Sequence, residues 1–193
     1  MDLQRGAGLR ETTRRAVRSQ IAAAAVDLFV EHGFEQTTVD QIATAVGMSQ
    51  RSVFRYFATK EDMAVDGLVE RGPEVLAALR ARPDTEPPHV ALRQALNLCL
   101  GLRADTDLRR ARLFAETPAL RLAIMRKHLQ WTELLLPEMT RRLAGAARPE
   151  LTADAIIAAT LSCLDVATAE WVRREGVESF ADLFDAALAS LRA

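Results

Sequence analysis

The stretch from Thr37 to Lys60, TTVDQIATAVGMSQRSVFRYFATK, has the pattern of two short helices joined by a tight turn. Thr38 can cap the first helix, and Gln41 stands three residues later, where its side chain can bond back to the Thr38 backbone. Gly47 follows where a helix commonly ends on a left-handed residue, and Ser49 can cap the next helix. This is the helix-turn-helix pattern, whose second helix enters the major groove of DNA.

The second helix of the pair has an apolar side and a polar side. Val53 and Phe57 are four residues apart and should face inward, with Phe54 flanking them. Glutamine pairs well with adenine and arginine with guanine, whereas serine, tyrosine and lysine mostly reach phosphates. The candidate DNA-binding residues are Gln50, Arg51 and Arg55 for base edges, Thr38, Ser49, Tyr56 and Lys60 for phosphates, and Ser52 beside them. The alternative is a solvated amphipathic helix with ordinary surface arginines, because short helix pairs also occur in proteins that never meet DNA.

The run from about Val17 to Leu68 resembles the DNA-binding domain of the TetR family of bacterial transcription regulators. The matching residues are Ile21, Ala24, Leu28, Phe29, Gly33, Phe34, Thr37, Thr38, Val39, Ile42, Ala43, Val46, Gly47, Met48, Ser49, Ser52, Val53, Phe54, Arg55, Tyr56, Phe57, Thr59, Lys60, Glu61 and Asp62. Arg51 stands where the family often has glycine, and Phe54 and Tyr56 stand where tyrosine and histidine are frequent. Phe54 has no hydroxyl group with which to contact a phosphate. The resemblance implies an all-α, DNA-binding regulator.

The charge of the chain is uneven along the sequence. Residues 1–60 hold eight Lys and Arg against six Asp and Glu, a net +2, and the remainder holds 17 against 20, a net −3. Arg5, Arg10, Arg14, Arg15 and Arg18 crowd the N-terminal arm and the start of the first helix. Such residues can neutralise phosphates and make DNA binding depend steeply on salt. For Arg5 and Arg10 a flexible solubilising tail is an equal alternative.

The composition is that of one intracellular chain, which we expect in the cytoplasm. Of the 193 residues, 49% are hydrophobic and 26% charged, which is typical of neither a disordered nor a membrane protein. No apolar run approaches the roughly 20 residues that a membrane helix needs, and the start has no secretory signal. Cys99 and Cys163 do not make a disulfide framework and should pack as small apolar groups.

We expect an all-α fold of about nine helices, without strands or internal repeats. The first should cover residues 13–32, and the helix-turn-helix pair should follow it. Later helices should cover residues 59–80, 90–103, 107–116, 118–143, 152–174 and 179–191, with Pro137 kinking or splitting its helix. Thr152 and Ser179 should cap the last two. The expected domains are a flexible basic arm over 1–12, the helix-turn-helix DNA-binding domain over 13–60, and a ligand-binding and dimerisation domain over 61–193.

The last two helices carry more apolar surface than one small bundle easily hides. In a symmetric dimer the same pair from each subunit makes a four-helix interface, and a two-fold protein with two recognition helices reads a palindromic operator. The candidate interface residues are Ile157, Leu161, Leu164, Phe180, Phe184 and Leu188. A monomer that folds both stripes inward is the alternative.

The C-terminal part resembles an actinobacterial TetR subgroup that includes mycofactocin-type regulators, some of which respond to fatty acyl-CoA. The resemblance lies in LRRARLFAETPALRLAIMRKHLQWTELLLPEMTRRLAG and in CLDVATAEW. It implies a small-molecule pocket whose occupation releases the operator. The candidate pocket residues are Leu113, Phe114, Met125, His128, Leu129, Trp131, Thr132, Cys163 and Ala167, each of which could instead be ordinary core. A pocket with few polar groups would suit a largely apolar effector.

Other chemistry finds no support in the sequence. The three histidines lie far apart, no metal-ligand spacing occurs, and there is no glycine-rich phosphate loop, Gly-x-Ser-x-Gly or Cys-x-x-Cys. We expect no catalytic residue, metal or cofactor. The preferred interpretation is a homodimeric, ligand-responsive TetR-type repressor. The alternatives are an activator of the same architecture, a regulator that responds to another protein, and a helical carrier or enzyme without a DNA partner.

Overall fold

The computed structural model describes residues 2–99 and 104–191, and within these the side chains of residues 10–97 and 108–191. All regular structure in the described part is helical, in ten helices, which confirms the expected all-α class. The chain divides into two compact units, residues 1–67 and 68–193.

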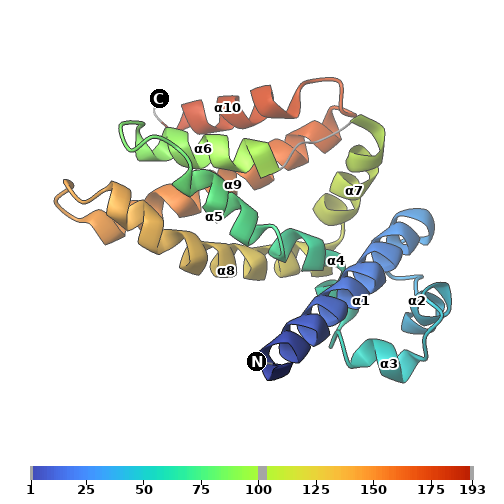
Figure 1. Ribbon diagram of the computed structural model, residues 1–193. Coiled ribbons are helices and arrows are strands. Elements are labelled where there is room, and N and C mark those ends of the chain that lie inside the picture. The colour runs from blue at the N-terminus through green and yellow to red at the C-terminus, as the bar shows by residue number, and fades with distance from the viewer. Residues whose placement is uncertain (1, 100–103, 192–193) are drawn as a thin grey trace. The chain divides into compact units, whose positions relative to one another are not determined.

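The first unit contains the helix-turn-helix pair. Its helices are α1 (Asp2–His32), α2 (Val39–Ala45), α3 (Gln50–Phe54) and the greater part of α4 (Lys60–Val69). Figure 1 shows α2 and α3 lying on the same side of the long α1. The core residues are Ile21, Ala25, Phe29, Phe34, Ile42, Val53, Phe57 and Met63, all at most 4% exposed. Val53 and Phe57 face inward as predicted.

Capping groups that are close in the sequence determine where the two short helices begin and where the first one ends. The Gln41 amide donates to Thr38 Oγ1, and the Thr38 amide donates to Gln41 Oε1 at 2.7 Å, so the predicted capping box is present. Gly47 has φ +66°, and the Ser52 amide donates to Ser49 Oγ at 3.2 Å. The sequence predicted these caps because each uses groups that are close along the chain.

One arginine of α1 ties the end of the recognition helix to the rest of the unit. Arg18 Nε donates to Asp66 Oδ1 on α4 at 2.6 Å, and its Nη1 donates to the carbonyl of Tyr56, also at 2.6 Å. The guanidinium lies over the Phe57 ring, 4.2 Å from the ring centroid. Asp66 is buried, so Arg18 supplies the charge partner that a buried carboxylate requires.

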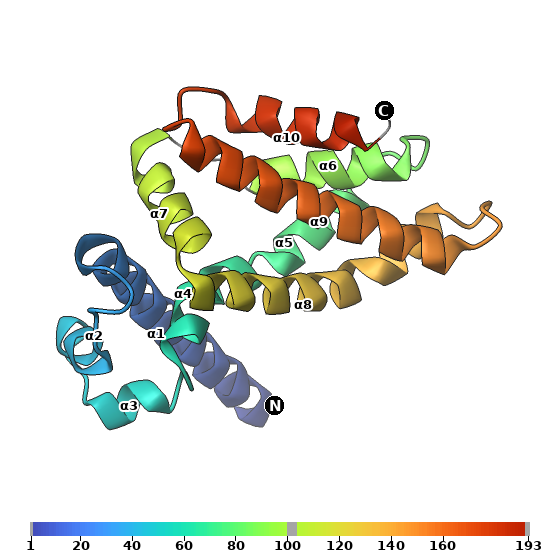
Figure 2. The ribbon, with the colours of Figure 1, turned by 180° about the vertical axis from the view of Figure 1, so that it is seen from behind.

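The second unit is a bundle of six helices. They are α5 (Gly72–Arg80), α6 (Pro88–Cys99), α7 (Ala104–Glu116), α8 (Pro118–Arg142), α9 (Pro149–Arg173) and α10 (Phe180–Ser190). Figure 2 shows α9 running between α8 and α10, and α9 also packs against α6 and α7. Its central core includes Leu79, Leu92, Leu96, Trp131, Leu135, Met139, Ile157, Leu161 and Phe184.

The helix α9 has the length and composition of a membrane-crossing helix, with a mean hydropathy of 1.5 over its most apolar window. From the sequence we expected no apolar run of this length, whereas α9 meets the criterion by its length and composition. A core helix meets the same criterion. Burial of Ile157, Leu161 and Leu164 inside the bundle accounts for the apolar residues on one side of α9.

Several helix boundaries differ from those expected. The helix expected over residues 59–80 is two helices, because the chain turns at Glu70 and Arg71 between α4 and α5. The helix α1 begins at Asp2 instead of residue 13, so part of the expected arm is helical. The helix α8 is not split at Pro137. The helix α9 begins at Pro149, where proline suits the first turn, and Thr152 lies inside it instead of capping it.

Gly72 begins α5 against the side chain of Trp131. A β-carbon at Gly72 would lie 3.0 Å from Trp131 Nε1 and 3.0 Å from Leu134 Cδ2. Because Trp131 is only 1% exposed and cannot move aside, we expect Gly72→Ala to lower the free energy of unfolding by about 1–3 kcal/mol. Urea unfolding followed by circular dichroism measures this. Gly145→Ala is the matched control, because no heavy atom lies within 4 Å of its added carbon. An equal effect of both substitutions would contradict this close approach.

Candidate functional site

The outward side of α3 and the turn after it carries polar side chains that have no partner inside the unit. Gln50, Arg51 and Arg55 are exposed, and their side chains make no hydrogen bond or ion pair with any residue that the structure describes. The helix beneath them is fixed by the Ser49 cap and by buried Val53. Three predicted base-contacting residues are therefore presented to solvent on a capped, anchored helix. The helix is shorter than expected and ends at Phe54, whose ring is 48% exposed.

Three other predicted contacts are already used in the fold. The Thr38 hydroxyl belongs to the capping box of α2, where it also donates to Gln41 Oε1 at 3.2 Å. Ser49 Oγ and Ser52 Oγ lie 2.9 Å apart and share a hydrogen bond. These hydroxyls are exposed or half-buried, and each holds the start of a helix.

Lys60 has a role that the sequence did not suggest. Its ammonium donates to the carbonyls of Phe34 at 2.8 Å and Thr37 at 2.9 Å, and it lies 4.5 Å from the centroid of the Phe34 ring. Two of its three donors therefore hold the loop between α1 and α2 against the start of α4. The expectation that Lys60 contacts a phosphate stays a prediction. The sequence did not indicate its bonds within the unit, because these carbonyls are more than twenty positions away.

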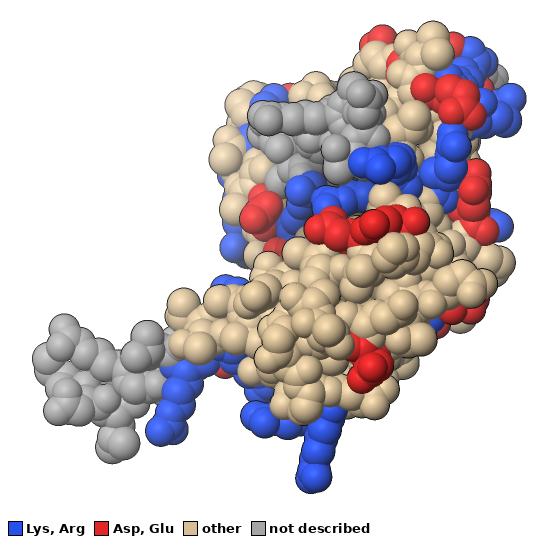
Figure 3. Space-filling view, turned by 90° about the vertical axis from the view of Figure 1, so that its right-hand side faces the viewer, with Lys and Arg blue, Asp and Glu red and all other residues tan. Residues whose placement is uncertain are grey.

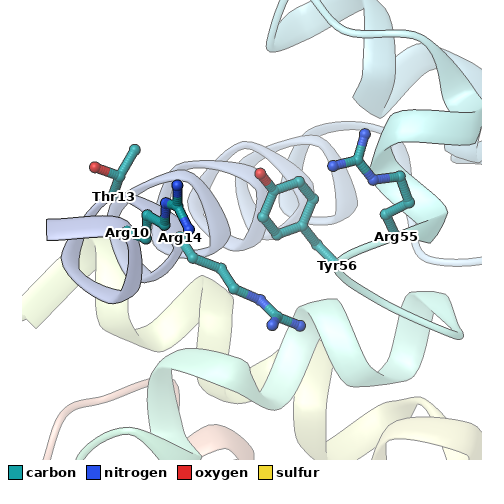
Figure 4. Close-up of a pocket in the computed structure, with 5 residues that line it drawn as sticks. All are labelled: Arg10, Thr13, Arg14, Arg55 and Tyr56. Atoms are coloured by element: carbon teal, nitrogen blue, oxygen red, sulfur yellow. The ribbon is translucent and has the colours of Figure 1, made fainter. Parts of the chain in front are cut away.

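A hollow of about 600 Å³ lies between α1 and the turn after α3. It is lined by Arg10, Thr13 and Arg14 from α1 and by Arg55 and Tyr56. Figure 4 shows the Tyr56 ring between the α1 side chains and Arg55. Arg10 and Arg14 are exposed and pair with no other described residue. Three guanidinium groups and a phenol hydroxyl thus surround one open depression, which is a donor set suited to a phosphate group.

In the sequence, Arg10 and Arg14 belong to the basic N-terminal stretch, and no local pattern there places them beside Arg55 and Tyr56. Their spacing of four residues was the available signal, since it puts both on one face of a helix. In Figure 3, Lys and Arg side chains project from the lower edge of the first unit.

The predicted effector-pocket residues fall into three groups. Leu113, Trp131, Cys163 and Ala167 are buried, and Phe114, His128 and Thr132 are half-buried. Met125 and Leu129 are 61% and 67% exposed, so they do not line the interior of the bundle. The sequence alone could not separate them, because α8 is apolar on more than one face and Leu122, also exposed, continues the outer stripe.

The predicted dimer-interface residues lie inside the protomer. Ile157, Leu161, Leu164 and Phe184 are at most 6% exposed and belong to the core, and Phe180 and Leu188 pack against that core. The first four therefore have almost no surface to offer a second copy, which disfavours them as interface residues, whereas Phe180 and Leu188 are half-buried and remain predictions. The helix α9 is apolar on two sides, and helical periodicity selected the more hydrophobic side, which is the core. The exposed side carries Leu151, Ala155, Ala158, Ser162 and Val166.

Among the side chains that the structure describes, no three His, Cys, Asp or Glu residues come together as metal ligands would. Cys163 is buried, and burial raises the pKa of its thiol. Cys99 lies outside the described side chains.

A capped helix-turn-helix with polar side chains on its outer face, joined to a helical bundle, defines a DNA-binding regulator of the helix-turn-helix class. The family model for bacterial regulatory proteins of the tetR family matches residues 21–66, and the model for the MftR C-terminal domain matches residues 86–193. The chain belongs to the TetR family of bacterial transcriptional regulators, with a C-terminal domain of the MftR type.

Relatives and solved structures agree with this assignment. The chain is 33% identical to the HTH-type transcriptional regulator TcmR of Streptomyces glaucescens, over 97% of this chain and 88% of that protein. It is 28% identical to MftR of Mycobacterium tuberculosis, named as a mycofactocin biosynthesis transcriptional regulator, over 92% of each. The fold is similar to Thermus thermophilus FadR in complex with lauroyl-CoA (TM-score 0.55, 22% identity, 91% and 93% covered). It is also similar to Bacillus subtilis FadR with stearoyl-CoA (TM-score 0.58, 20% identity, 89% and 96% covered).

The contacts of Lys60 give a prediction. Lys60→Met should lower the free energy of unfolding of the first unit by about 1–3 kcal/mol, because it removes two charge-assisted hydrogen bonds to backbone carbonyls. Hydrogen exchange at the amides of α2 measures this destabilisation. Arg51→Met, which removes a cation without an internal partner, should leave exchange unchanged. Unchanged exchange in Lys60→Met together with weaker DNA binding would instead restore the phosphate role.

Proposed function

We propose that this regulator is a ligand-responsive transcriptional repressor, which binds a palindromic operator as a homodimer and releases it when a small, largely apolar effector binds in the second unit. Such a protein acts on the chromosome, so we place it in the cytoplasm. The observation that carries the proposal is the set of exposed, internally unpaired Gln50, Arg51 and Arg55 side chains on one capped helix.

An activator of the same architecture is the alternative, because the sign of regulation depends on where the operator lies relative to the promoter. A carrier or enzyme without a DNA partner is disfavoured. Such a protein has no use for three unpaired polar side chains gathered on a helix of five residues and the turn after it.

The contacts to DNA divide by chemistry. Gln50, Arg51 and Arg55 would read base edges, since amide and guanidinium groups form bidentate pairs with adenine and guanine. Arg10, Arg14 and Tyr56 would hold a backbone phosphate in the hollow that they line with Arg55. Phosphate contacts set orientation and affinity, whereas base contacts set sequence preference.

The exposed side of α9 is the surface that we assign to the dimer. Leu151 and Val166 are about 60% exposed in the single chain, and the small residues Ala155, Ala158 and Ser162 lie between them at helical spacing. Small residues let two helices approach closely, and the flanking large ones bury area. A second copy of the same helix would cover this stripe symmetrically.

The effector is proposed to occupy the interior of the second unit near α8 and α9. The FadR structures named above hold lauroyl-CoA and stearoyl-CoA, ligands with long apolar chains. Here the buried members of the candidate pocket are mostly apolar, which supports an effector with a largely apolar body.

Selection of bound sequences from random duplex DNA by the purified protein tests this function. Recovery of a palindromic motif at near-physiological salt would support a dimeric operator binder. A preparation carrying a releasing ligand would recover a motif only after unfolding and refolding. Absence of any motif after refolding would overturn the DNA-binding role.

The division between phosphate and base contacts gives a prediction. Replacing Arg10 and Arg14 together by Gln should weaken binding to all DNA sequences alike. It should also reduce the slope of log affinity against log salt concentration by about 0.9 for each phosphate that is no longer neutralised. Arg51→Ala is the matched comparison. It should cost about 1–3 kcal/mol of binding free energy and weaken the sequence preference at one base position. Binding titrations over a salt series, with operator and random duplexes, measure both. A change of sequence preference in the double variant would contradict its phosphate role.

The proposed dimer surface gives a further prediction. Ala158→Glu should weaken dimerisation at least about tenfold, because the two-fold axis would bring like charges together. Sedimentation velocity over a concentration series measures the change. Ala77→Glu, at an exposed position of α5, is the control and should leave the dimer intact. A dimer that tolerates Glu at position 158 would place the interface elsewhere.

A further inference from the structure

The inside of the second unit contains a lysine without an ordinary partner. Lys127 on α8 is only 5% exposed, and its ammonium makes no hydrogen bond with the residues that the structure describes. Its Nζ lies over the face of Trp131, 4.2 Å from the ring centroid. A buried ammonium needs hydrogen-bond acceptors or a counter-charge, and an aromatic face replaces only part of the lost hydration.

Two polar atoms of neighbouring residues are completely inaccessible, unlike the Lys127 ammonium, and have no partner. Trp131 Nε1 and His128 Nε2 are both inaccessible and bond to nothing in the described part of the chain. Buried N–H groups and ring nitrogens are nearly always satisfied, so each exception requires an explanation. These residues lie within about one turn of α8, and Trp131 Nε1 faces Gly72 at the start of α5, where a side chain would not fit.

The nearby carboxylate explains only part of this arrangement. Asp165 Oδ2 on α9 lies 3.4 Å from His128 Nδ1, but the Asp165 side chain is 48% exposed. Burial lowers the pKa of Lys127 to about 8, although the negative charge of Asp165 acts in the opposite direction. Burial and the charge of Lys127 lower the pKa of His128 to about 3, so the imidazole is neutral. Burial raises the pKa of Asp165 to about 6, against the opposing charges of Lys127 and Arg121.

At neutral pH the cluster therefore presents an ammonium donor, an indole donor and a neutral imidazole. The proton of that imidazole belongs on Nδ1, facing the Asp165 carboxylate, which leaves Nε2 as an acceptor. Two adjacent donors, one of them charged, fit an anionic oxygen. No buried carboxylate among the described residues is left over to bind a cation here.

We infer that Lys127 and Trp131 bind the anionic group of the effector, with His128 accepting a hydrogen bond from the same molecule. The inference rests on the ligand-responsive function proposed above and narrows its ligand class to acidic amphiphiles, which have an apolar body and a carboxylate, phenolate or comparable anion. A core cluster satisfied by trapped water is the competing explanation.

Two fluorescent dyes with the same aromatic body test the inference. Anilinonaphthalene sulfonate carries a permanent anion, and N-phenylnaphthylamine carries no charge. The full-length protein should bind the sulfonate more tightly than the neutral dye. Lys127→Met should weaken sulfonate binding at least about tenfold and leave the neutral dye unchanged, since methionine keeps the apolar stem and removes the charge. Arg126→Gln is the matched control, because it removes an exposed cation one position away.

The outcomes separate the two proposals. The anion site would be overturned if the protein bound both dyes with equal affinity, or if Lys127→Met weakened the binding of both dyes equally. Either result would still support an apolar effector pocket. A sulfonate preference that Arg126→Gln abolishes equally would place the anion on the surface and overturn the inference. Binding of neither dye would count against the anion site and against the pocket itself, whereas the DNA selection experiment would remain independent of both.

The wild-type protein provides a second measurement, which does not depend on how the variant folds. Between pH 7 and pH 9 the sulfonate keeps its charge while Lys127, with a pKa of about 8, loses its proton. Asp165 on α9 is ionised and His128 is neutral throughout this range, and Arg121 keeps its charge. Sulfonate binding should therefore weaken by up to about tenfold, with the neutral dye unaffected. Equal affinities for the sulfonate at both pH values would overturn the role of Lys127.

Discussion

The geometry of the DNA-binding unit depends on Arg18. Its guanidinium bonds at 2.6 Å to the Asp66 carboxylate and to the carbonyl at Tyr56, and it covers the face of Phe57. One side chain thereby connects α1, the chain that leaves the recognition helix, and α4. Asp66 is 4% exposed, and leaving a buried carboxylate without its partner commonly costs about 3–5 kcal/mol, less here because Arg18 is itself 35% exposed. The recognition helix has only five residues, so such tertiary attachments, more than its own helical propensity, determine where it lies.

The polar residues around the helix-turn-helix are of two kinds, those that bond within the unit and those that do not. Arg18, Lys60 and the capping hydroxyls of Thr38 and Ser49 are used to build the unit. Gln50, Arg51 and Arg55 have no such use, and Arg10 and Arg14 likewise have no partner among the side chains that the structure describes. A rigid frame with unpaired side chains on its outer face loses little conformational freedom when it binds, because only the side chains themselves must become ordered. The same composition of arginines and hydroxyls, without the frame, would bind DNA only through charge.

How much the sequence could predict depended on the range of each interaction. The capping box at Thr38, the left-handed Gly47 and the cap at Ser49 use neighbours along the chain, and all three were predictable. The Arg18–Asp66 pair and the bonds of Lys60 join residues at least twenty positions apart, and no spacing rule indicates them. For the helix α9, the sequence left the core-facing side undecided for another reason. This helix is apolar on two opposite sides, so periodicity could not decide which side faces the core, and the buried Ile157 and Leu161 were assigned to a dimer.

Coupling between effector and operator requires that the effector favour one arrangement of the protein over another, since equal affinity for both would shift nothing. The chain connects the relevant residues closely. Trp131 packs against Gly72 at the start of α5, and Gly72 follows Asp66, the partner of Arg18, by six positions in the sequence. An added side chain at Gly72 would meet the indole, so a ligand at the proposed site would contact a residue that packs directly against the start of α5. Any displacement of Gly72 passes through the turn at Glu70 and Arg71 into α4, which carries both Asp66 and Lys60. The chain that leaves this proposed site therefore leads directly into α4, the helix that carries two of the residues that hold the first unit together.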